Sequence, residues 1–276
     1  LENSYTSTIN NGSTTVTIPS GGFNILNDGT YRLNATINDI AENHTTIVSD
    51  PFIIDITKPI INPLLSSGFS WGLYLNASED DEARTVFIST QGVEDGQTLS
   101  GLLNSIIYTA DVYDNSAVLT IPATYLQALT DGSQYNFTLN VSDLAGNPAD
   151  TVTSQNFIVD VSKPVVNVEQ GIGNFIFNMN ILPEYLNILK FPVILINSNE
   201  SGKLTSSMTF KKDENGLDVT EIDIVAGSNI IVRFERLPFG TYSNGELTLT
   251  DAAENSTTLP IPEFQVTMPV LVIKSR

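Results

Sequence analysis

Apolar and polar residues alternate along residues 131–164, and two other stretches of the chain repeat this pattern. Single polar residues separate the four apolar positions of its first half, which are Tyr135, Phe137, Leu139 and Val141. This two-residue period predicts a strand with one face in a core and the other in water. Residues 28–59 and 239–269 are related copies. A unit used three times predicts a chain of tandem modules.

Two turns and a second strand complete the unit. A glycine lies shortly before the tyrosine of each copy, which is typical of a tyrosine corner, where the phenol contacts upstream backbone. Residues 143–147, DLAGN, reverse the chain with residues that favour tight turns. The second strand ends at Asp160 and leads into Lys163 and Pro164. This proline predicts a domain boundary, because it donates no ladder hydrogen bond.

The complete pattern resembles the Ig-like repeats of prokaryotic surface proteins, which occur in large adhesins and surface-layer proteins. It consists of Gly-x-Tyr or Gly-x-x-Tyr, an eight-residue strand, D-x-A-G-N and F-x-x-D-x-[ST]-K-P. The resemblance covers essentially the whole chain, and it implies an all-β fold of tandem Ig-like antiparallel β-sandwiches arranged end to end. Glu42 and Glu254 replace the glycine of the D-x-A-G-N turn, so we expect this position not to require a positive φ.

The spacing of the copies predicts the domain organisation. Tyr5, Ile18 and Asp28 each match a residue 103 positions later, so residues 1–58 correspond to the back half of a domain without its opening strands. We expect four segments: this half domain, complete Ig-like domains at 59–163 and 164–268, and the first strand of a further module at 269–276. The expected inward positions of the half domain are Tyr31, Leu33, Ala35 and Ile37. Strands from a longer polypeptide or from a neighbouring subunit would have to cover this face.

An internal match extends the comparison to the third domain. We match the strand at 193–196 with the strand at 71–75. The segment 197–200 then takes the place of the acidic turn at 76–82, which puts Glu200 at the position of that turn.

Composition narrows the range of functions. The 276 residues carry a net charge of −19, which argues against nucleic-acid partners and is compatible with cations, high salt or simple solubility. The absence of cysteine excludes disulfides and thiolate sites. The sequence holds no run of eighteen apolar residues, so we expect no membrane insertion by this segment and any export signal or anchor outside it. The only histidine, His44, follows a turn, and we expect no catalytic residues and no enzyme activity.

Carboxylates and amides at the ends of the strands predict calcium at two domain junctions. Calcium takes six to eight oxygen ligands from such groups. The residues expected at the first junction are Asp55, Glu79, Asp80, Asp143 and Asn147, and those at the second are Asp160, Glu200, Asp251 and Asn255. The alternative is that each Asp only caps its own turn through Asx hydrogen bonds.

Eight Asn-x-Ser/Thr sequons predict glycosylation. They are Asn11, Asn34, Asn43, Asn76, Asn136, Asn140, Asn199 and Asn255. A glycan at Asn43 or Asn255 would compete with a buried metal.

These observations favour a non-catalytic structural or interaction segment of an extracellular surface-layer, stalk or filament-coat protein. Its expected partners are copies of itself or neighbouring surface proteins. Three alternatives stay open: spacer domains of an adhesin, a virion or phage decoration protein, and an accessory β-domain of a secreted polysaccharide-active enzyme, which would bind carbohydrate.

Overall fold

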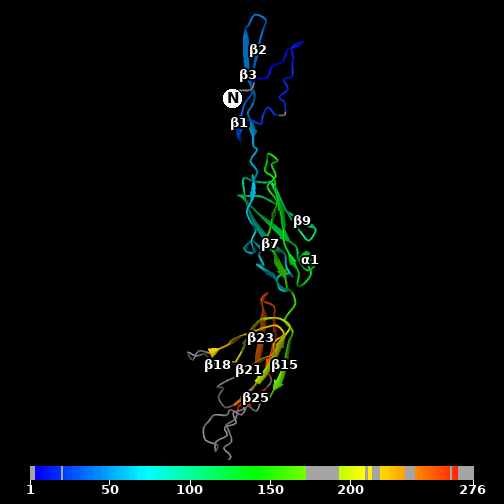
Figure 1. Cartoon of the computed structure of the whole chain (residues 1–276), viewed down its shortest axis with the longest axis vertical. Coiled ribbons are helices and arrows are strands. Elements are labelled where there is room, and N and C mark those ends of the chain that lie inside the picture. Colours follow the sequence, from blue (N-terminus) through cyan, green and yellow to red (C-terminus); the bar gives the residue numbers. More distant parts are fainter. Residues whose placement is uncertain are drawn as a thin grey trace, which may run out of the picture. The chain divides into compact units, whose positions relative to one another are not determined.

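The computed structural model describes residues 4–19, 21–171, 193–208, 211–212, 218–233, 240–261 and 263–266. Apart from one short α-helix and one 3-10 turn, the regular elements of this part of the chain are all strands (Figure 1). The predicted all-β fold class is therefore confirmed. No helix within the described ranges is long and apolar enough to cross a membrane.

The chain divides into two compact units, and each is built from several stretches. Unit 1 comprises Leu1–Leu65, Phe87–Leu119 and Phe137–Gln155, and unit 2 comprises Ser66–Val86, Thr120–Asn136 and Asn156–Arg276. Strands β7 (Arg84–Gln91) and β10 (Ser116–Ile121) contribute residues to both units. The domain boundaries expected after residues 58, 163 and 268 stay predictions, and the strand expected at 269–276 lies outside the described residues.

The first part of unit 1 consists of two antiparallel strand pairs. β1 (Gly29–Tyr31) pairs with β4 (Phe52–Ile54), and β2 (Asn34–Asn38) pairs with β3 (His44–Val48). Every residue of β2 and β3 is exposed. Leu33 and Ile37 are each 47% exposed, whereas the matching Phe137 and Val141 are 0% and 4% exposed. The apolar face expected to point inward is therefore open here, and its covering by further strands stays a prediction.

The rest of unit 1 contains a four-stranded antiparallel sheet. Its strands, in order across the sheet, are β13 (Val152–Thr153), β12 (Thr138–Asn140), β8 (Thr98–Leu103) and β9 (Ile106–Asp111). β5 (Ile60–Ile61) pairs with the end of β7. A Cβ on Gly101 would come within 2.5 Å of the Leu119 side chain and 3.2 Å of Leu139, so any larger residue at this position of β8 would displace these core side chains. Phe137, Leu139 and Val141 are buried, as their alternation predicted.

One sheet of unit 2 pairs strands that are far apart in the sequence. β6 (Tyr74–Leu75) runs parallel to β14 (Phe157–Val159), which pairs antiparallel with β11 (Gln134–Tyr135). The short elements η1 (Ser66–Gly68) and α1 (Ala123–Leu126) lie in the same unit. Phe69, Trp71 and Phe157 form an aromatic cluster with ring centroids 5.1–5.5 Å apart.

The predicted tyrosine corners form in both of the copies that can be followed. The hydroxyl of Tyr135 accepts a hydrogen bond from the backbone amide of Thr130 (2.9 Å). In the first copy, the hydroxyl of Tyr31 donates to the carbonyl of Asn27 (2.9 Å). Both phenols therefore fix the backbone upstream of their strand, as the glycine–tyrosine spacing predicted.

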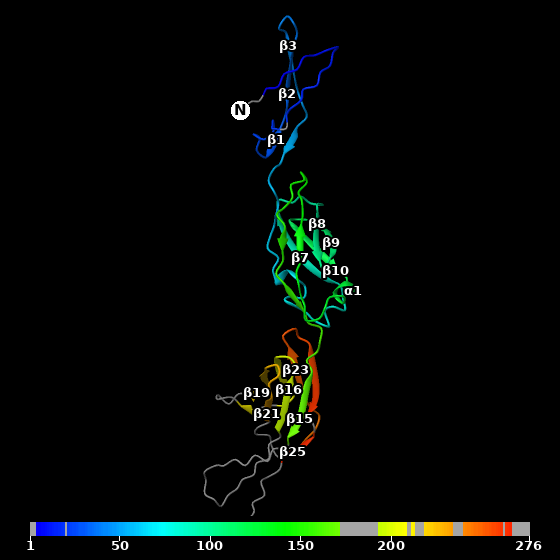
Figure 2. The same cartoon turned by 45° about the vertical axis from the view of Figure 1, so that its right-hand side comes forward.

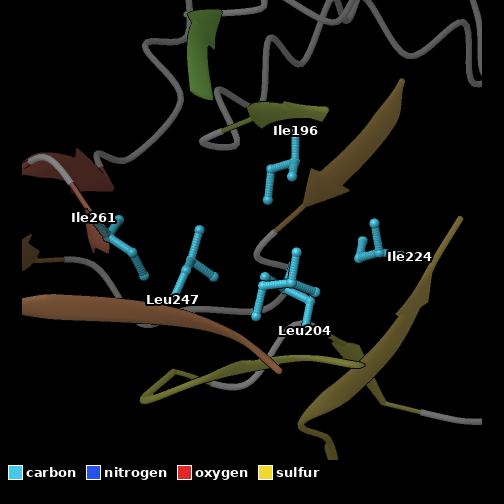
Figure 3. Packing of buried hydrophobic residues seen from close by; sticks show 6 residues of the cluster. Ile196, Leu204, Ile224, Leu247 and Ile261 are labelled. Atoms are coloured by element: carbon cyan, nitrogen blue, oxygen red, sulfur yellow. The ribbon is translucent and has the colours of Figure 1, made fainter. Parts of the chain in front are cut away.

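The remaining strands of unit 2 form sheets around a second apolar core (Figure 2). The first sheet is β15 (Val166–Gly171), β16 (Val193–Ser198) and β21 (Ile230–Arg233), and the second is β20 (Glu221–Ile224), β17 (Gly202–Ser206), β23 (Gly245–Asp251) and β24 (Ser256–Ile261). Two further pairs are β18 (Lys211–Lys212) with β19 (Asp218–Val219) and β22 (Gly240–Tyr242) with β25 (Phe264–Val266). Side chains from several of these strands meet in one buried cluster, which consists of Ile196, Leu204, Ile224, Leu247, Leu249 and Ile261 (Figure 3).

Strand register corrects the internal match made from the sequence. Val166 of β15 stands opposite Ser198 of β16, as Ile61 of β5 stands opposite Thr90 of β7. β16 is therefore the counterpart of β7, whereas residues 74–75 form a strand parallel to β14. It follows that Glu200 matches Gly92 and not the acidic turn at 76–82. Alternation alone could not separate the two candidate strands, because both are short and apolar.

Backbone geometry corrects a second expectation. Gly146 has a φ of 91°, and the matching Glu42 and Glu254 have φ values of 66° and 69°. The position requires a positive φ in all three copies. Glutamate occupies it despite the steric cost that every side chain with a Cβ has there.

Candidate metal centre

Three carboxylates meet in unit 2 at the ends of three strands. Asp160 follows β14, Glu200 follows β16, and Asp251 is the last residue of β23. Each side chain offers one carboxylate oxygen, and these oxygens all lie within 4.8 Å of one another. Asp251 is only 9% exposed. The structure thus brings together three of the four residues expected at the second junction, in an arrangement that can hold a cation.

Two oxygens of this cluster lack a hydrogen-bond partner. Oδ1 of Asp251 accepts from the backbone amides of Ala253 (2.8 Å) and Asn255 (2.9 Å). Oδ2 of Asp251 and Oε2 of Glu200 are buried without any partner. A buried carboxylate oxygen that is left unpaired costs free energy that a bound cation would recover.

The electrostatics of the cluster are unfavourable without a cation. Burial, and then the charges of Asp251 and Asp131, raise the pKa of Asp160 above its ordinary value. Burial, and then the charges of Asp160 and Asp251, raise the pKa of Glu200. Both shifts mean that the folded chain resists the charged form of these groups, and a positive ion between them would reverse this effect.

The same turn has a different hydrogen-bond pattern in the first two copies. Asn147 donates to Asp143 with its backbone amide (2.7 Å, to Oδ1) and with Nδ2 (2.8 Å, to Oδ2). Asn43 donates to Asp39 in the same way, at 2.9 Å and 2.8 Å. Nδ2 of Asn147 also donates to the carbonyl of Asp55 (3.1 Å). In the third copy Nδ2 of Asn255 keeps only the bond of this second kind, at 2.7 Å to the carbonyl of Asp160 and 3.4 Å to its Oδ1, and does not bond Oδ2 of Asp251. This difference leaves Oδ2 of Asp251 free for another partner.

Asn255 also contacts the turn that follows β6. Its Oδ1 accepts from the backbone amide of Ala77 (3.1 Å), and Nδ2 of the buried Asn76 donates to the carbonyl of Ala253 (2.8 Å). Oε2 of Glu79 accepts from the backbone amide of Asn76 (3.1 Å). The sequence grouped Glu79 and Asp80 with the first junction, whereas the structure places their turn beside the turn at 251–255.

The other residues expected at the first junction are engaged in hydrogen bonds within unit 1. Oδ1 of Asp55 accepts from the backbone amide of Thr57 (3.1 Å), and the carbonyl of Asp55 accepts from Asn147 (3.1 Å). Both carboxylate oxygens of Asp143 are bonded to Asn147. Among the described residues, Asp160, Glu200 and Asp251 are the one group of three acidic or imidazole side chains that could hold a metal ion.

Two of the eight sequons are buried. The amides of Asn76 and Asn255 donate to backbone carbonyls, and these residues are 8% and 5% exposed, so neither amide is available in the folded chain. Asn76 and Asn255 differ from the other sequon asparagines in being buried, and the three-residue sequon carries no information about burial. The other six are exposed, and their glycosylation stays a prediction: Asn11, Asn34, Asn43, Asn136, Asn140 and Asn199.

The donor set fits a hard cation. It consists only of carboxylate oxygens, with no nitrogen or sulfur ligand, which suits calcium or magnesium rather than zinc. The histidine His44 is exposed at the start of β3. Within the described ranges, the expectation of calcium therefore has a specific location at the second junction.

Comparison with known proteins agrees with the fold. Residues 1–56 and 104–161 match the model of the bacterial Ig-like domain family. The predicted resemblance to Ig-like repeats is thereby confirmed. No curated protein matches the chain.

Several solved structures are similar at low identity. One is a 1.5-MDa bacterial ice-binding adhesin, with 16% identity and a TM-score of 0.39 over 78% of this chain and 66% of that one. A Ca²⁺-stabilized adhesin of an Antarctic bacterium, which binds ice, has 17% identity and a TM-score of 0.37 over 94% and 63%. The fibronectin(III)-like modules of Clostridium thermocellum CbhA have 13% identity and a TM-score of 0.39 over 79% and 98%. The chain thus spans 66% and 63% of the length of the two adhesin chains.

Proposed function

We propose that this chain is a non-catalytic structural segment of an extracellular bacterial surface protein, and that a calcium ion at Asp160, Glu200 and Asp251 stabilises it. One observation carries the calcium assignment: Oδ2 of Asp251 is buried without a partner in a group of three carboxylates. The bacterial Ig-like sequence of residues 1–56 and 104–161 supports the structural role. The net charge of −19 and the lack of cysteine fit an extracellular β-protein that uses cations rather than disulfides.

The role of the ion follows from where its ligands lie. Asp160 follows β14, Glu200 follows β16, and Asp251 ends β23. An ion bound by all three would connect three separate chain segments and would neutralise their mutual repulsion. Because calcium takes six to eight oxygen ligands, water or backbone carbonyls would complete its coordination. Binding to the folded chain alone would stabilise it by mass action.

The setting of the segment has one leading assignment and three alternatives. We assign it to a surface-layer, stalk or filament-coat protein that contacts copies of itself or neighbouring surface proteins. An ordered array or filament in electron micrographs of the purified protein would support this assignment. Adhesin spacer, virion decoration and accessory β-domain of a polysaccharide-active enzyme are the alternatives, and binding to a carbohydrate panel would favour the last.

Calorimetry on the full chain tests the calcium site. The protein is stripped with a chelator and then titrated with CaCl₂, while its melting temperature is followed. We expect the melting temperature to rise with calcium. At a calcium concentration a hundredfold above Kd, the free energy of unfolding should increase by roughly 2.7 kcal/mol. Glu200→Gln should abolish most of this rise, because it removes one of the three charges.

Glu94→Gln is the matched control. Oε2 of Glu94 accepts from the backbone amide of Leu144 (2.8 Å), so this carboxylate also serves a turn but lies outside the cluster. Its response to calcium should equal that of the unmodified chain. A melting temperature that does not change with calcium would disprove the calcium site, and an equal loss in both variants would show that binding is not specific to the cluster.

A further inference from the structure

The backbone that leads to Asp160 is held by hydrogen bonds from two neighbouring segments. The amide of Val159 donates to the carbonyl of Ser133 (3.0 Å), and the carbonyl of Val159 accepts from the amide of Gly132 (2.8 Å). The amide of Asp160 itself donates to the carbonyl of Leu75 (2.9 Å). These bonds fix the chain up to Asp160, but they do not reach the residues that follow it.

The side chain of Asp131 holds the chain beyond Asp160. Its Oδ1 accepts from the backbone amide of Val161 (2.9 Å), and its Oδ2 accepts from the hydroxyl of Ser162. Both oxygens of this carboxylate therefore bond the two residues that follow the proposed ligand. Asp131 does not belong to the group of three carboxylates that could hold the ion. It would therefore act on an ion through Asp160 or through its charge.

The charge of Asp131 also reaches the cluster. After burial and the charge of Asp251, the charge of Asp131 raises the pKa of Asp160. The hydroxyl of Ser162, and then the amide of Val161, lower the pKa of Asp131 itself, so this group is ionised at neutral pH. A cation at the cluster would therefore be attracted by a fourth negative charge that is not one of its ligands.

The same pair of bonds occurs in the first copy of the repeat, where the described residues form no carboxylate cluster. Oδ1 of Asp28 accepts from the backbone amide of Ile56 (2.8 Å), and Oδ2 accepts from the hydroxyl of Thr57. In the sequence of the third copy, Phe239 takes the place of this aspartate, and residues 264–269, FQVTMP, contain no aspartate either. The aspartate before the glycine and the aspartate after the second strand thus occur together in two copies and are absent together from the third.

We propose that Asp131 is a positioning residue of the cation site, an inference that rests on the proposed calcium site. By bonding Val161 and Ser162 it keeps the carboxylate of Asp160 directed at the ion, and its own charge strengthens the attraction. Asp28 makes the same local bonds and only fastens the end of its strand. A comparison of the two aspartates therefore separates a role in metal binding from a purely structural role.

Isothermal titration calorimetry of the full chain with CaCl₂ tests this role. The quantity measured is the Kd of the binding step that Glu200→Gln removes, so that weak binding elsewhere on the acidic surface does not count. Asp131→Asn keeps an acceptor for Val161 and removes the charge. It should raise this Kd about fivefold, the order expected for a unit charge and a divalent ion several ångström apart in water. In about 1 M NaCl the difference should shrink, because salt screens this attraction.

Asp131→Ala removes the charge and both bonds. Its Kd should rise roughly twentyfold, because the loss of a hydrogen bond that places Asp160 multiplies the effect of the lost charge. In chelator it should also melt at a lower temperature than Asp131→Asn, which keeps the bond to Val161. Asp28→Asn and Asp28→Ala are the matched controls, since they make the same changes in the first copy and should leave the Kd unchanged.

The outcomes separate this inference from the calcium site. If calcium binds with the same Kd to the unmodified chain, Asp131→Asn and Asp131→Ala, then Asp131 is only a structural fastener and the inference is wrong, while the calcium site stands. An equal rise of the Kd in Asp28→Asn would also overturn the inference, because the effect would not be specific to the site. The absence of any binding step that Glu200→Gln removes would overturn both proposals. Asp131→Asn decides the question even if Asp131→Ala does not fold.

Discussion

The turn at 143–147 and the turn at 251–255 share a backbone and differ in chemistry. In the first, the aspartate is fully bonded to its own asparagine. In the second, the side-chain amide of the asparagine bonds to Asp160 but not to its own aspartate, and one aspartate oxygen is unpaired. One contributor to the difference is Glu200, which comes two residues after Ser198, whereas Gly92 comes two residues after the matching Thr90.

The second copy has a glutamate in the same connection, Glu94, but with a different role. Glu94 accepts a hydrogen bond from the backbone of Leu144, whereas Glu200 faces Asp160 and Asp251. Gly202 could not be replaced by glutamate, because a Cβ there would lie 2.2 Å from the carbonyl oxygen of Thr250. The placement of one glutamate therefore distinguishes the two turns. The carboxylate of Asp143 is fully hydrogen-bonded within its own turn, whereas Oδ2 of Asp251 lacks a partner.

The largest expected effect is on the free energy of unfolding, which the same substitution should change in opposite directions in the two turns. Asp251→Asn should stabilise the chelated protein by about 1 kcal/mol, since it removes one of three neighbouring charges and the new amide can donate to a carboxylate of the cluster. Asp143→Asn should destabilise it by about 1–3 kcal/mol, because two amide groups would then face each other in a buried turn. Chemical denaturation in the presence of chelator measures both.

The calcium response provides the second half of this comparison. Asp251→Asn should no longer respond to calcium, while Asp143→Asn should keep the response of the unmodified chain. Destabilisation of the chelated protein by both substitutions would contradict the proposed difference between the turns.

The pH dependence of stability should also differ between the turns. Its direction follows from whether the pKa of each carboxylate is raised or lowered in the folded chain. The ordinary pKa is 4.5 for Glu200 and 3.8 for Asp160, and both pKa values are raised in the folded chain. The folded state therefore binds protons at these groups more tightly than the unfolded state does. The chelated protein therefore gains stability from these groups as pH falls through their raised folded pKa values, and the gain is complete below their ordinary values. Asp39, whose pKa is lowered by the side chain and backbone of Asn43, behaves oppositely: its contribution is present above 3.8 and is lost as pH falls through its folded pKa.

A comparison of the unmodified chain with Glu200→Gln isolates this effect. In chelator the variant should melt at a higher temperature at neutral pH, and the gap should close as the pH approaches 4.5, the ordinary value of Glu200. With calcium at neutral pH, the unmodified chain should instead melt at a higher temperature than Glu200→Gln. Acid should remove this advantage of the unmodified chain, because protons compete with calcium for the carboxylate ligands. A gap that does not depend on pH in chelator would show that the charge of Glu200 is not what destabilises the cluster.

The sequence predicted the repeated parts of the fold better than the site. The alternation of Phe137, Leu139 and Val141 identified a buried face, because burial on one side of a strand imposes a period of two. Pairing partners carry no such local signal. The match of 193–196 with residues 71–75 made Glu200 the counterpart of the acidic turn at 76–82, and only the register of β15 with β16 corrected this equivalence.

The candidate site shows the same limit. The sequence groups Asp160, Asp251 and Asn255 because they belong to the repeated unit, and these residues lie close together in the structure. The role of Asn76 as a hydrogen-bond donor to Ala253 was missed, since its sequon suggested an exposed residue. No local pattern reveals a contact between residues 177 positions apart.

The smallest expected effect concerns the backbone that the turns share. Glu42 and Glu254 have positive φ values where the second copy has Gly146. Because a side chain with a Cβ costs about 1–2 kcal/mol in this conformation and glycine loses more entropy on folding, Glu254→Gly should stabilise the chain by a net amount of about 0.5–1 kcal/mol. Gly146→Ala should destabilise it by a similar amount, and thermal denaturation in chelator measures both.

Because the side chain of Glu254 is exposed and belongs to no ligand set, the calcium response of Glu254→Gly should equal that of the unmodified chain. A loss of stability in Glu254→Gly would mean that the turns owe their shape to this side chain and not to the bonds between Asp251 and Asn255.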